Sequence, residues 1–317
     1  MTRILAILRE PELSAMAFER LGDDCPGVSV TTHDSVAAAR DDLATAEVLV
    51  TIGPMLGDQA AAAYRAMPAL RWIQSIGTGT DNLAGHPALA PDVAVSNVRG
   101  LHGAQMSEAA IAAMLTLARD VPRLVGQQAA RVWDRFPARL LAGSTVGILG
   151  MGLIAEALAP RLKALGMTVV GISAAVRAVP GFDRVVARDS LHDAVADLDW
   201  LVLLVPHAPA THHIIDAGVL AAMKPTACLI NLSRGGVLDD AALLAALQER
   251  TIAGAALDVF EHEPLPADHP LWSAPNLILT PHVAGYHTGY AADVYAAVRD
   301  NVIRYRSGGV AALANRV

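Results

Sequence analysis

The sequence predicts an α/β protein of two domains, each built around a parallel sheet, and three observations support this fold class. Short runs of β-branched and leucine residues alternate with helical patterns almost from end to end. The length of 317 residues suits two moderate domains better than one average domain. A helical segment at residues 103–130 is too long for a simple crossover, so we expect the chain to leave one domain and enter another there.

The first third of the chain contains enough strand-like runs for a complete small α/β unit. Helical patterns separate these runs, as expected where parallel strands are joined by crossovers. The strands are expected at Ile4–Leu8, Val28–Thr31, Val48–Thr51, Arg71–Ile76 and Val93–Ser96.

A second series of strand-like runs follows the long helical segment, and six strands with helices between them predict a doubly wound sheet. After Gly285 an amphipathic helix remains that has no strand left to pair with in this sheet, so we predict that it returns to the first domain. The strands of the second series are expected at Thr145–Leu149, Thr168–Ile172, Trp200–Val205, Ala227–Leu232, Gly254–Asp258 and Leu277–Thr280.

Composition and charge argue against several classes of protein. The net charge is -7 and no run of Lys or Arg is present, so neither nucleic acid nor an anionic membrane is expected as the main partner. The apolar runs are shorter than the roughly 18 residues that span a membrane, and the one near the N-terminus is too short for a secretory signal. Cys25 and Cys228 fit neither a disulfide framework nor a zinc finger, so we expect a cytoplasmic protein.

A glycine-rich turn opens the second series of strands. The strand Thr145–Leu149 directly precedes "GMGLIA" at residues 150–155, and a helix follows, which is the context that dinucleotide binding requires. Gly150 permits the tight turn, Gly152 lets the backbone approach a pyrophosphate, and Ala155 lets the helix pack closely on the strand. The helix N-terminus supplies N–H donors for the phosphates. The alternative is a glycine-rich turn that binds no ligand.

The residue that ends the next strand indicates which dinucleotide is bound. An acidic residue there would hold the ribose hydroxyls of NAD, but "GMTVVGIS" ends in Ser173. Serine can donate to the 2′-phosphate of NADP, and Arg177 lies near enough in sequence to pair with that phosphate. NADP is therefore the preferred cofactor. If Ser173 is only a loop residue and Arg177 a solvated charge, the site accepts NAD and NADP alike.

Three later stretches end strands of the same sheet, at the edge where open α/β sheets bind ligands. "NLSRGG" places Arg234 before two glycines that would let the backbone approach a ligand, "DVFEHEPLP" contains Asp258 and Glu263, and "TPHVAG" contains His282. Reduction of a 2-keto acid requires a proton donor for the carbonyl oxygen and a cation that anchors the carboxylate. A glutamate partner keeps a histidine protonated nearer to neutral pH.

These four motifs, in this order, resemble the D-isomer-specific 2-hydroxyacid dehydrogenase family over nearly the whole chain. The resemblance implies that His282 is the acid/base, Glu263 its hydrogen-bonded partner, Arg234 the substrate anchor and Asp258 a contact of the nicotinamide carboxamide. Further cofactor-binding positions are expected at Leu153, Ile154, Ser233 and Gly285.

The resemblance also implies how the chain is divided. We expect a flavodoxin-like substrate domain at residues 1–98 and 287–317, and a Rossmann-like dinucleotide-binding domain at residues 99–286. In "QSIGTGTDNL" the positions Thr78 and Gly79 match the family's substrate loop, whose backbone amides bind a carboxylate.

Two positions depart from the family pattern, and they bear on how the cofactor is bound. Leu153 stands where many members carry an Arg near the pyrophosphate, so phosphate contacts are expected from the backbone or from elsewhere. Ser173 replaces the usual Asp, as in NADP-preferring glyoxylate and hydroxypyruvate reductases, which the chain resembles most. The family's dimers form around the helical segment at residues 103–130, so we expect a homodimer. Trp133 either enters the neighbouring subunit's substrate pocket or packs in the dimer interface.

The expected function is NAD(P)H-dependent reduction of a small 2-keto acid of glyoxylate or hydroxypyruvate type to the D-2-hydroxy acid. Two alternatives remain: an NAD-dependent dehydrogenase of phosphoglycerate or lactate, and a dinucleotide-sensing binding protein like the family's corepressors. No metal site is expected, because adjacent His212 and His213 diverge on any regular element, and Glu261 and His262 lack a second cluster of ligands.

Overall fold

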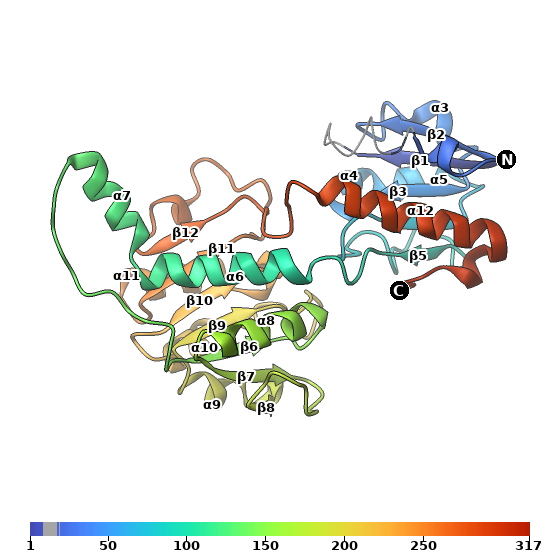
Figure 1. Cartoon of the computed structure of the whole chain (residues 1–317). Coiled ribbons are helices and arrows are strands. Elements are labelled where there is room, and N and C mark those ends of the chain that lie inside the picture. The colour runs from blue at the N-terminus through green and yellow to red at the C-terminus, as the bar shows by residue number, and fades with distance from the viewer. Residues whose placement is uncertain (9–17, 19) are drawn as a thin grey trace. The chain divides into compact units, whose positions relative to one another are not determined.

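The computed structural model describes residues 1–8, 18 and 20–317, and the chain divides into two compact units (Figure 1). Unit 1 comprises Met1–Leu101 and His287–Val317, and unit 2 comprises His102–Tyr286. Each unit is built around one sheet whose neighbouring strands are parallel, which confirms the predicted fold class. Within the described ranges, no helix is both long and apolar enough to cross a membrane.

The sheet of unit 1 has the order β2-β1-β3-β4-β5, which is that of flavodoxin-like folds. Side chains of β1 alternate between the two faces: Ile4 and Ala6 join one core, and Leu5 and Ile7 join the other. The strands are Thr2–Ile7 (β1), Val28–His33 (β2), Val48–Thr51 (β3), Trp72–Ser75 (β4) and Ala94–Ser96 (β5). The helices are Arg20–Asp24 (α2), Arg40–Leu43 (α3), Gly53–Leu56 (α4), Ala60–Arg65 (α5) and Tyr290–Gly308 (α12).

The last helix, α12, packs in unit 1, where the sequence analysis placed it. Val294, Val298 and Val302 recur every four residues on one side of the helix and are buried in the core that contains Ile4. Asn301 donates through Nδ2 to Gln74 Oε1 of β4 at 2.8 Å. The end of the chain thus completes the core of the domain in which the chain began.

The sheet of unit 2 has the order β12-β11-β10-β9-β6-β7-β8. The order reverses between β6 and β9, and open α/β sheets bind ligands in the crevice at such a reversal. The strands are Thr145–Leu149 (β6), Thr168–Ser173 (β7), Arg184–Ala187 (β8), Trp200–Leu203 (β9), Cys228–Asn231 (β10), Gly254–Leu257 (β11) and Leu277–Leu279 (β12). The sequence predicted six of them and missed β8, because this short edge strand is only partly buried and begins with a charged residue.

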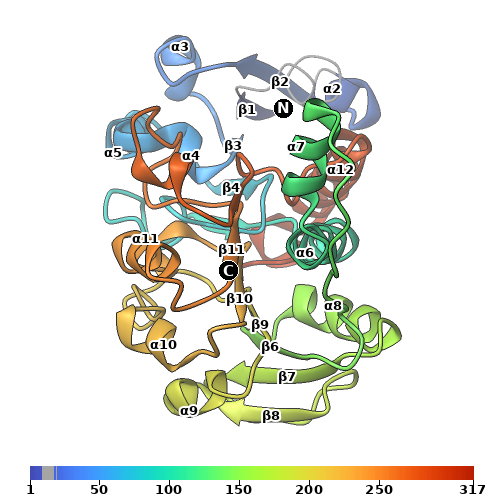
Figure 2. The same cartoon turned by 90° about the vertical axis from the view of Figure 1, so that its left-hand side faces the viewer.

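Helices cover both faces of this sheet (Figure 2). Helices α6 and α8 bury apolar side chains on one face, and α9, α10 and α11 do so on the other. The helices of unit 2 are Gly103–Ala118 (α6), Val121–Ala130 (α7), Leu153–Ala164 (α8), Leu191–Val195 (α9), Ala217–Ala222 (α10) and Asp240–Gln248 (α11).

The prediction of a single helical segment at residues 103–130 is wrong in detail. The helix ends at Ala118, Asp120 adopts a left-handed conformation with φ of 50°, and α7 starts at Val121 with Pro122 in its first turn. A proline in a helix interior would clash with the carbonyl four residues earlier, here that of Ala118, whereas a first turn tolerates it. Arg139 instead donates its backbone N–H to the Ala118 carbonyl at 3.0 Å.

Candidate active site

Four loops of unit 2 that carry the predicted site residues leave the carboxyl ends of strands β6, β10, β11 and β12. Because these strands are parallel, their carboxyl ends lie along one edge of the sheet. The loops contain the glycine-rich turn, Arg234, Glu263 and His282 in that order. Hydrogen bonds and close backbone approaches connect the three loops that carry Arg234, Glu263 and His282.

His282 and Glu263 form a hydrogen-bonded pair. His282 Nδ1 lies 2.6 Å from Glu263 Oε2, and Glu263 Oε1 accepts from the Phe260 backbone N–H at 2.9 Å. The two side chains are 45% and 33% exposed, so the pair is neither sealed in the core nor fully solvated. Because Nδ1 is held by the carboxylate, Nε2 is the ring nitrogen that can exchange a proton with a substrate.

Each member of the pair stabilises the charged form of the other, so the pKa of His282 is raised and the pKa of Glu263 is lowered. The hydrogen bond to Glu263 and the negative charge of Glu263 raise the pKa of His282. Burial and the positive charge of Arg234 lower this pKa by less, so the pKa of His282 lies above its ordinary value. Burial raises the pKa of Glu263, but the hydrogen bonds from His282 and Phe260 outweigh it, so that pKa lies below its ordinary value. The imidazole therefore keeps its proton to higher pH than a free histidine.

Asp258 holds the loop that carries His282. Its side chain is 2% exposed, and its carboxylate accepts from the Thr280 hydroxyl and from the backbone N–H groups of Val283 and Ala284, both at 2.9 Å. Its backbone carbonyl accepts from the His282 N–H at 2.8 Å, and His282 has a φ of 54°. A non-glycine residue in this left-handed region needs such outside support. Contact of Asp258 with a nicotinamide carboxamide stays a prediction.

Arg234 follows β10, and the two glycines after it allow close contacts within the protein that the sequence did not predict. A Cβ on Gly235 would lie 1.9 Å from the Phe260 carbonyl carbon, and one on Gly236 would lie 2.8 Å from His207 Nε2. These glycines therefore let the Arg234 loop approach other parts of the protein; approach of the same loop to a ligand stays a prediction. The Arg234 guanidinium donates to the Ser233 carbonyl at 2.7 Å.

The glycine-rich turn has the geometry that its motif requires. Gly150 has a φ of 100°, and a Cβ there would lie 2.7 Å from the backbone of Leu204 and Val205. Gly152 is the N-cap of α8, and its Cβ position faces open space, with no atom within 4 Å. Ala155 is fully buried against the sheet. The turn thus leaves room for an anion at the N-terminus of α8.

Ser173 and Arg177 lie near this turn, together with an acidic residue that the sequence analysis missed. Ser173 is the last residue of β7, and Arg177 reaches back to donate to Glu156 Oε1 at 3.0 Å and to the Met151 carbonyl at 3.4 Å. Glu156 belongs to the first turn of α8. An acid in the first turn of the helix expected to bind a pyrophosphate is a signal that could have identified Glu156 as the partner of Arg177.

The remaining predicted cofactor positions fall at the same strand ends. Leu153 is the first residue of α8 and is 43% exposed, and Ile154 follows it. Ser233 is buried and donates its hydroxyl to Asn231 Oδ1 at 2.8 Å. Gly285 follows the His282 loop and packs against His102, whose ring lies 3.1 Å from the position of a Cβ.

The predicted anion loop, with Thr78 and Gly79, belongs to unit 1 and follows β4. Ser75 Oγ lies 3.1 Å from the Gly77 carbonyl oxygen and 3.0 Å from that of Gly79, and Asn97 Nδ2 donates to the Thr78 carbonyl at 2.9 Å. In a trans peptide the C=O and N–H point in opposite directions. The Gly79 N–H therefore points away from Asn97, and the Thr78 N–H away from Ser75.

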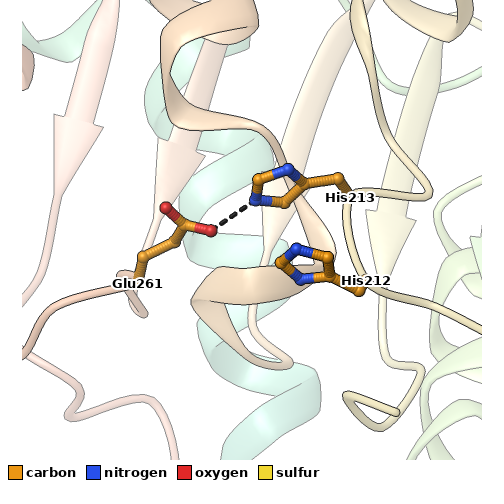
Figure 3. A group of neighbouring side chains, drawn as sticks. All are labelled: His212, His213 and Glu261. Carbon is orange, nitrogen blue, oxygen red and sulfur yellow. Dashed lines mark hydrogen bonds and ion pairs between the residues drawn. The ribbon is translucent and has the colours of Figure 1, made fainter. Parts of the chain in front are cut away.

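The expectation that His212 and His213 diverge is wrong. Both lie in a turn after β9, not on a regular element, and His213 has a φ of 47°. Their rings stack with centroids 4.0 Å apart, and His213 Nε2 forms a hydrogen bond with Glu261 (Figure 3). The assumption of regular secondary structure caused the error, since a left-handed residue redirects the side chain of its neighbour.

The order of motifs and the geometry of these loops agree with the comparison to known families. Residues 111–284 match the family described as D-isomer specific 2-hydroxyacid dehydrogenase, NAD binding domain. The chain belongs to this family. The matched region contains the glycine-rich turn, Arg234, Glu263 and His282. Unit 2 therefore carries the NAD-binding domain of an oxidoreductase family.

Relatives of known name act on different substrates. The chain is 37% identical over 221 residues to (S)-sulfolactate dehydrogenase of Chromohalobacter salexigens, which covers 69% of this chain and 72% of that protein. It is 34% identical over 255 residues to glyoxylate reductase of Korarchaeum cryptofilum, with 78% and 76% covered. It is 36% identical over 216 residues to D-3-phosphoglycerate dehydrogenase of Methanocaldococcus jannaschii, which covers 67% of this chain but only 41% of that protein.

Solved structures of the family share the fold over the whole chain. A family member from Aeromonas salmonicida has a TM-score of 0.89 at 32% identity, covering 100% of this chain and 98% of that one. An NADPH-dependent glyoxylate/hydroxypyruvate reductase from Sinorhizobium meliloti, in complex with NADP and sulfate, has a TM-score of 0.86 at 28% identity, with the same coverage. The two Rossmann-like domains are therefore those of this family.

Proposed function

We propose that this protein is a reductase that prefers NADPH and converts a small 2-keto acid of glyoxylate or hydroxypyruvate type to the D-2-hydroxy acid. The observation that carries this function is the hydrogen-bonded pair of His282 and Glu263 on the loops after β12 and β11. Arg234 acts electrostatically on both members of the pair. A proton donor beside a fixed cation is what reduction of a 2-keto acid requires.

The residues have separate roles in the proposed reaction. When bound, the nicotinamide supplies the hydride to the carbonyl carbon. The imidazolium of His282 donates the proton from Nε2 to the carbonyl oxygen, while Glu263 fixes the ring through Nδ1. Arg234 holds the substrate carboxylate and polarises the carbonyl. In unit 1 the backbone amides of Thr78 and Gly79 offer a second set of donors for a carboxylate.

The preference for NADPH rests on Ser173 and Arg177. The open space at Gly152 and the N-terminus of α8 fit a pyrophosphate, and Leu153 leaves its contacts to the backbone. A hydroxyl at Ser173 does not repel a 2′-phosphate, whereas a carboxylate would. Arg177 is 56% exposed and already paired with Glu156, so it can turn toward a phosphate at the cost of one solvent-exposed ion pair.

We also propose that the protein works as a homodimer. Helix α7 buries none of its side chains, and apolar residues of α7 and the following segment are exposed. We call these residues the α7 surface: Val121, Leu124, Val125, Val132 and Trp133. Trp133 is 94% exposed, and Figure 1 shows α7 standing away from the sheet of unit 2. Large exposed apolar side chains gathered on one helix and the segment after it support an interface with a second copy.

The function is tested by steady-state turnover of a substrate panel. Glyoxylate, hydroxypyruvate and pyruvate are each assayed with NADPH and with NADH, and kcat/KM is compared. We expect the highest kcat/KM with glyoxylate or hydroxypyruvate and NADPH. If no 2-keto acid causes oxidation of either cofactor, the enzyme function is wrong.

A second candidate is an NAD-dependent dehydrogenase of a larger 2-hydroxy acid, and the identity to phosphoglycerate and sulfolactate dehydrogenases favours it. The same panel therefore includes the phosphorylated and sulfonated analogues of hydroxypyruvate and pyruvate. A clear preference for one of these with NADH would select the second candidate over the first.

A further inference from the structure

We propose that His212, His213 and Glu261 form a binding site for a borderline divalent metal ion of the Zn²⁺ class, separate from the residues assigned to the reaction. The three side chains each offer a ligand atom, and these atoms all lie within 4.8 Å of one another (Figure 3). Two imidazole nitrogens and one carboxylate oxygen make a donor set that zinc sites use, with water completing a tetrahedron.

The backbone that carries these side chains is fixed from several directions. Buried Thr211 closes the turn, because its hydroxyl donates to the Pro206 carbonyl at 2.7 Å and accepts from the Ala208 N–H at 2.8 Å. His213 donates its N–H to the Gly236 carbonyl at 2.9 Å. Glu261 is fixed by the close approach of Gly235 to its backbone. Two separate loops thus present their ligands at the same place.

A third imidazole orients one of the ligands. His207 Nε2 lies 3.2 Å from His212 Nδ1, which leaves His212 Nε2 for a metal ion. A histidine that binds a metal is commonly held through its other ring nitrogen in this way. The carboxyl group of Asp240 adds negative charge, since it interacts electrostatically with both Glu261 and His213.

Binding requires a modest rearrangement of side chains. Ligand atoms around a tetrahedral zinc ion are about 3.3 Å apart, as follows from bonds of about 2.0 Å. The stacked rings of His212 and His213 must rotate to direct two nitrogens at one ion, and the His213 to Glu261 hydrogen bond must open to admit it. All three side chains reach solvent, so neither change disturbs the core.

The test uses the full-length protein without any histidine tag. Binding of Zn²⁺ is measured by titration calorimetry, and Co²⁺ is added as a probe because tetrahedral Co²⁺ has characteristic visible absorption. We expect one ion per chain and a tetrahedral Co²⁺ spectrum. His213→Ala and Glu261→Gln should each weaken binding by at least about tenfold, the loss seen even for residues that only orient ligands.

His192→Ala is the matched control, because this histidine is exposed on α9 and is not among the three ligands. Binding that is unchanged in the control and weakened in the two ligand variants supports the site. Three results would overturn it: no bound ion, equal affinity in the ligand variants and the wild type, or loss of binding in His282→Ala but not in His213→Ala. Far-ultraviolet circular dichroism checks that each variant is folded.

Discussion

His282 is fixed at two points, by Glu263 through its ring and by the Asp258 carbonyl through its backbone. Replacement by alanine removes the proposed proton donor and leaves the substrate-anchoring groups in place. We expect His282→Ala to lower kcat for reduction by roughly 10²–10⁴-fold, the usual contribution of a positioned general acid. His192→Ala serves as the control in the same steady-state assay, and near-normal turnover of His282→Ala would remove His282 from this role.

The carboxylate of Glu263 is expected to set the pH range of reduction. The reaction needs protonated His282, so kcat/KM is high below the pKa of His282 and falls as the pH rises through it. Glu263 raises that pKa, chiefly by its hydrogen bond. In Glu263→Gln the fall should therefore begin at lower pH than in the wild type. Profiles of kcat/KM against pH measure this shift, and an unchanged profile would show that Glu263 does not control the proton.

Arg177 and Glu156 are expected to act in opposite senses on cofactor choice. Arg177→Ala should raise the KM for NADPH and leave that for NADH nearly unchanged, because only NADPH carries the 2′-phosphate. Glu156→Gln releases Arg177 from an exposed ion pair, so it should lower the KM for NADPH by about 1.5–5-fold. An equal loss with both cofactors in Arg177→Ala would contradict the proposed role of Arg177.

Residues that directly follow strands could be predicted from the sequence, whereas contacts that depend on the paths of loops could not. Arg234, Glu263 and His282 could be placed at one edge of the sheet because each follows a strand-like run, and the carboxyl ends of parallel strands lie along one edge. The pairing of Arg177 with Glu156 and the stacking of His212 on His213 depend on the paths of loops. Those paths are set by contacts distant in sequence, which the spacing of motifs does not contain.

At the scale of elements, the approach of the β10 loop to the β11 loop depends on Gly235. A Cβ at this position would collide with the backbone of Phe260 and Glu261, and displacing that backbone moves the loop that carries Glu263. We expect Gly235→Ala to lower the free energy of unfolding by about 1–3 kcal/mol and to lower kcat. Thermal unfolding and turnover of the same preparation measure both effects.

Gly152→Ala is the matched control for this substitution. Its Cβ would face open space and its φ of -91° suits any residue, so the melting temperature should not change, whereas the KM for the cofactor should rise. If Gly235→Ala is as stable and active as the wild type, the two loops are not held together by this contact.

Sequence periodicity predicted most elements because buried parallel strands are continuous apolar runs. It failed at β8, whose residues are only partly buried, and at the boundary between α6 and α7. At that boundary both segments have helical composition, and Pro122 indicates an interruption, but the sequence does not show that the chain turns through a left-handed Asp120 before α7 starts.

At the scale of the whole molecule, the α7 surface is expected to form the contact between two copies of the chain. Val125→Glu places a charge in the middle of this surface and should weaken dimerisation by about tenfold or more. Ile303→Glu is the control, because Ile303 is similarly exposed on α12, at 50% against 58% for Val125. Sedimentation velocity over a range of concentrations compares the variants. A wild-type monomer would contradict the dimer, and an equal effect of both substitutions would contradict the α7 surface as its contact.

The central claim is hydride transfer from NADPH to a 2-keto acid with D stereochemistry, and it can be measured directly. NADPH deuterated at the transferred position of its nicotinamide is incubated with hydroxypyruvate and the protein, and the glycerate formed is analysed by mass spectrometry and chiral chromatography. We predict D-glycerate with a single deuterium at C2, and loss of its formation in His282→Ala. Unlabelled glycerate, the L isomer, or no product from hydroxypyruvate or any other 2-keto acid would contradict the proposed function.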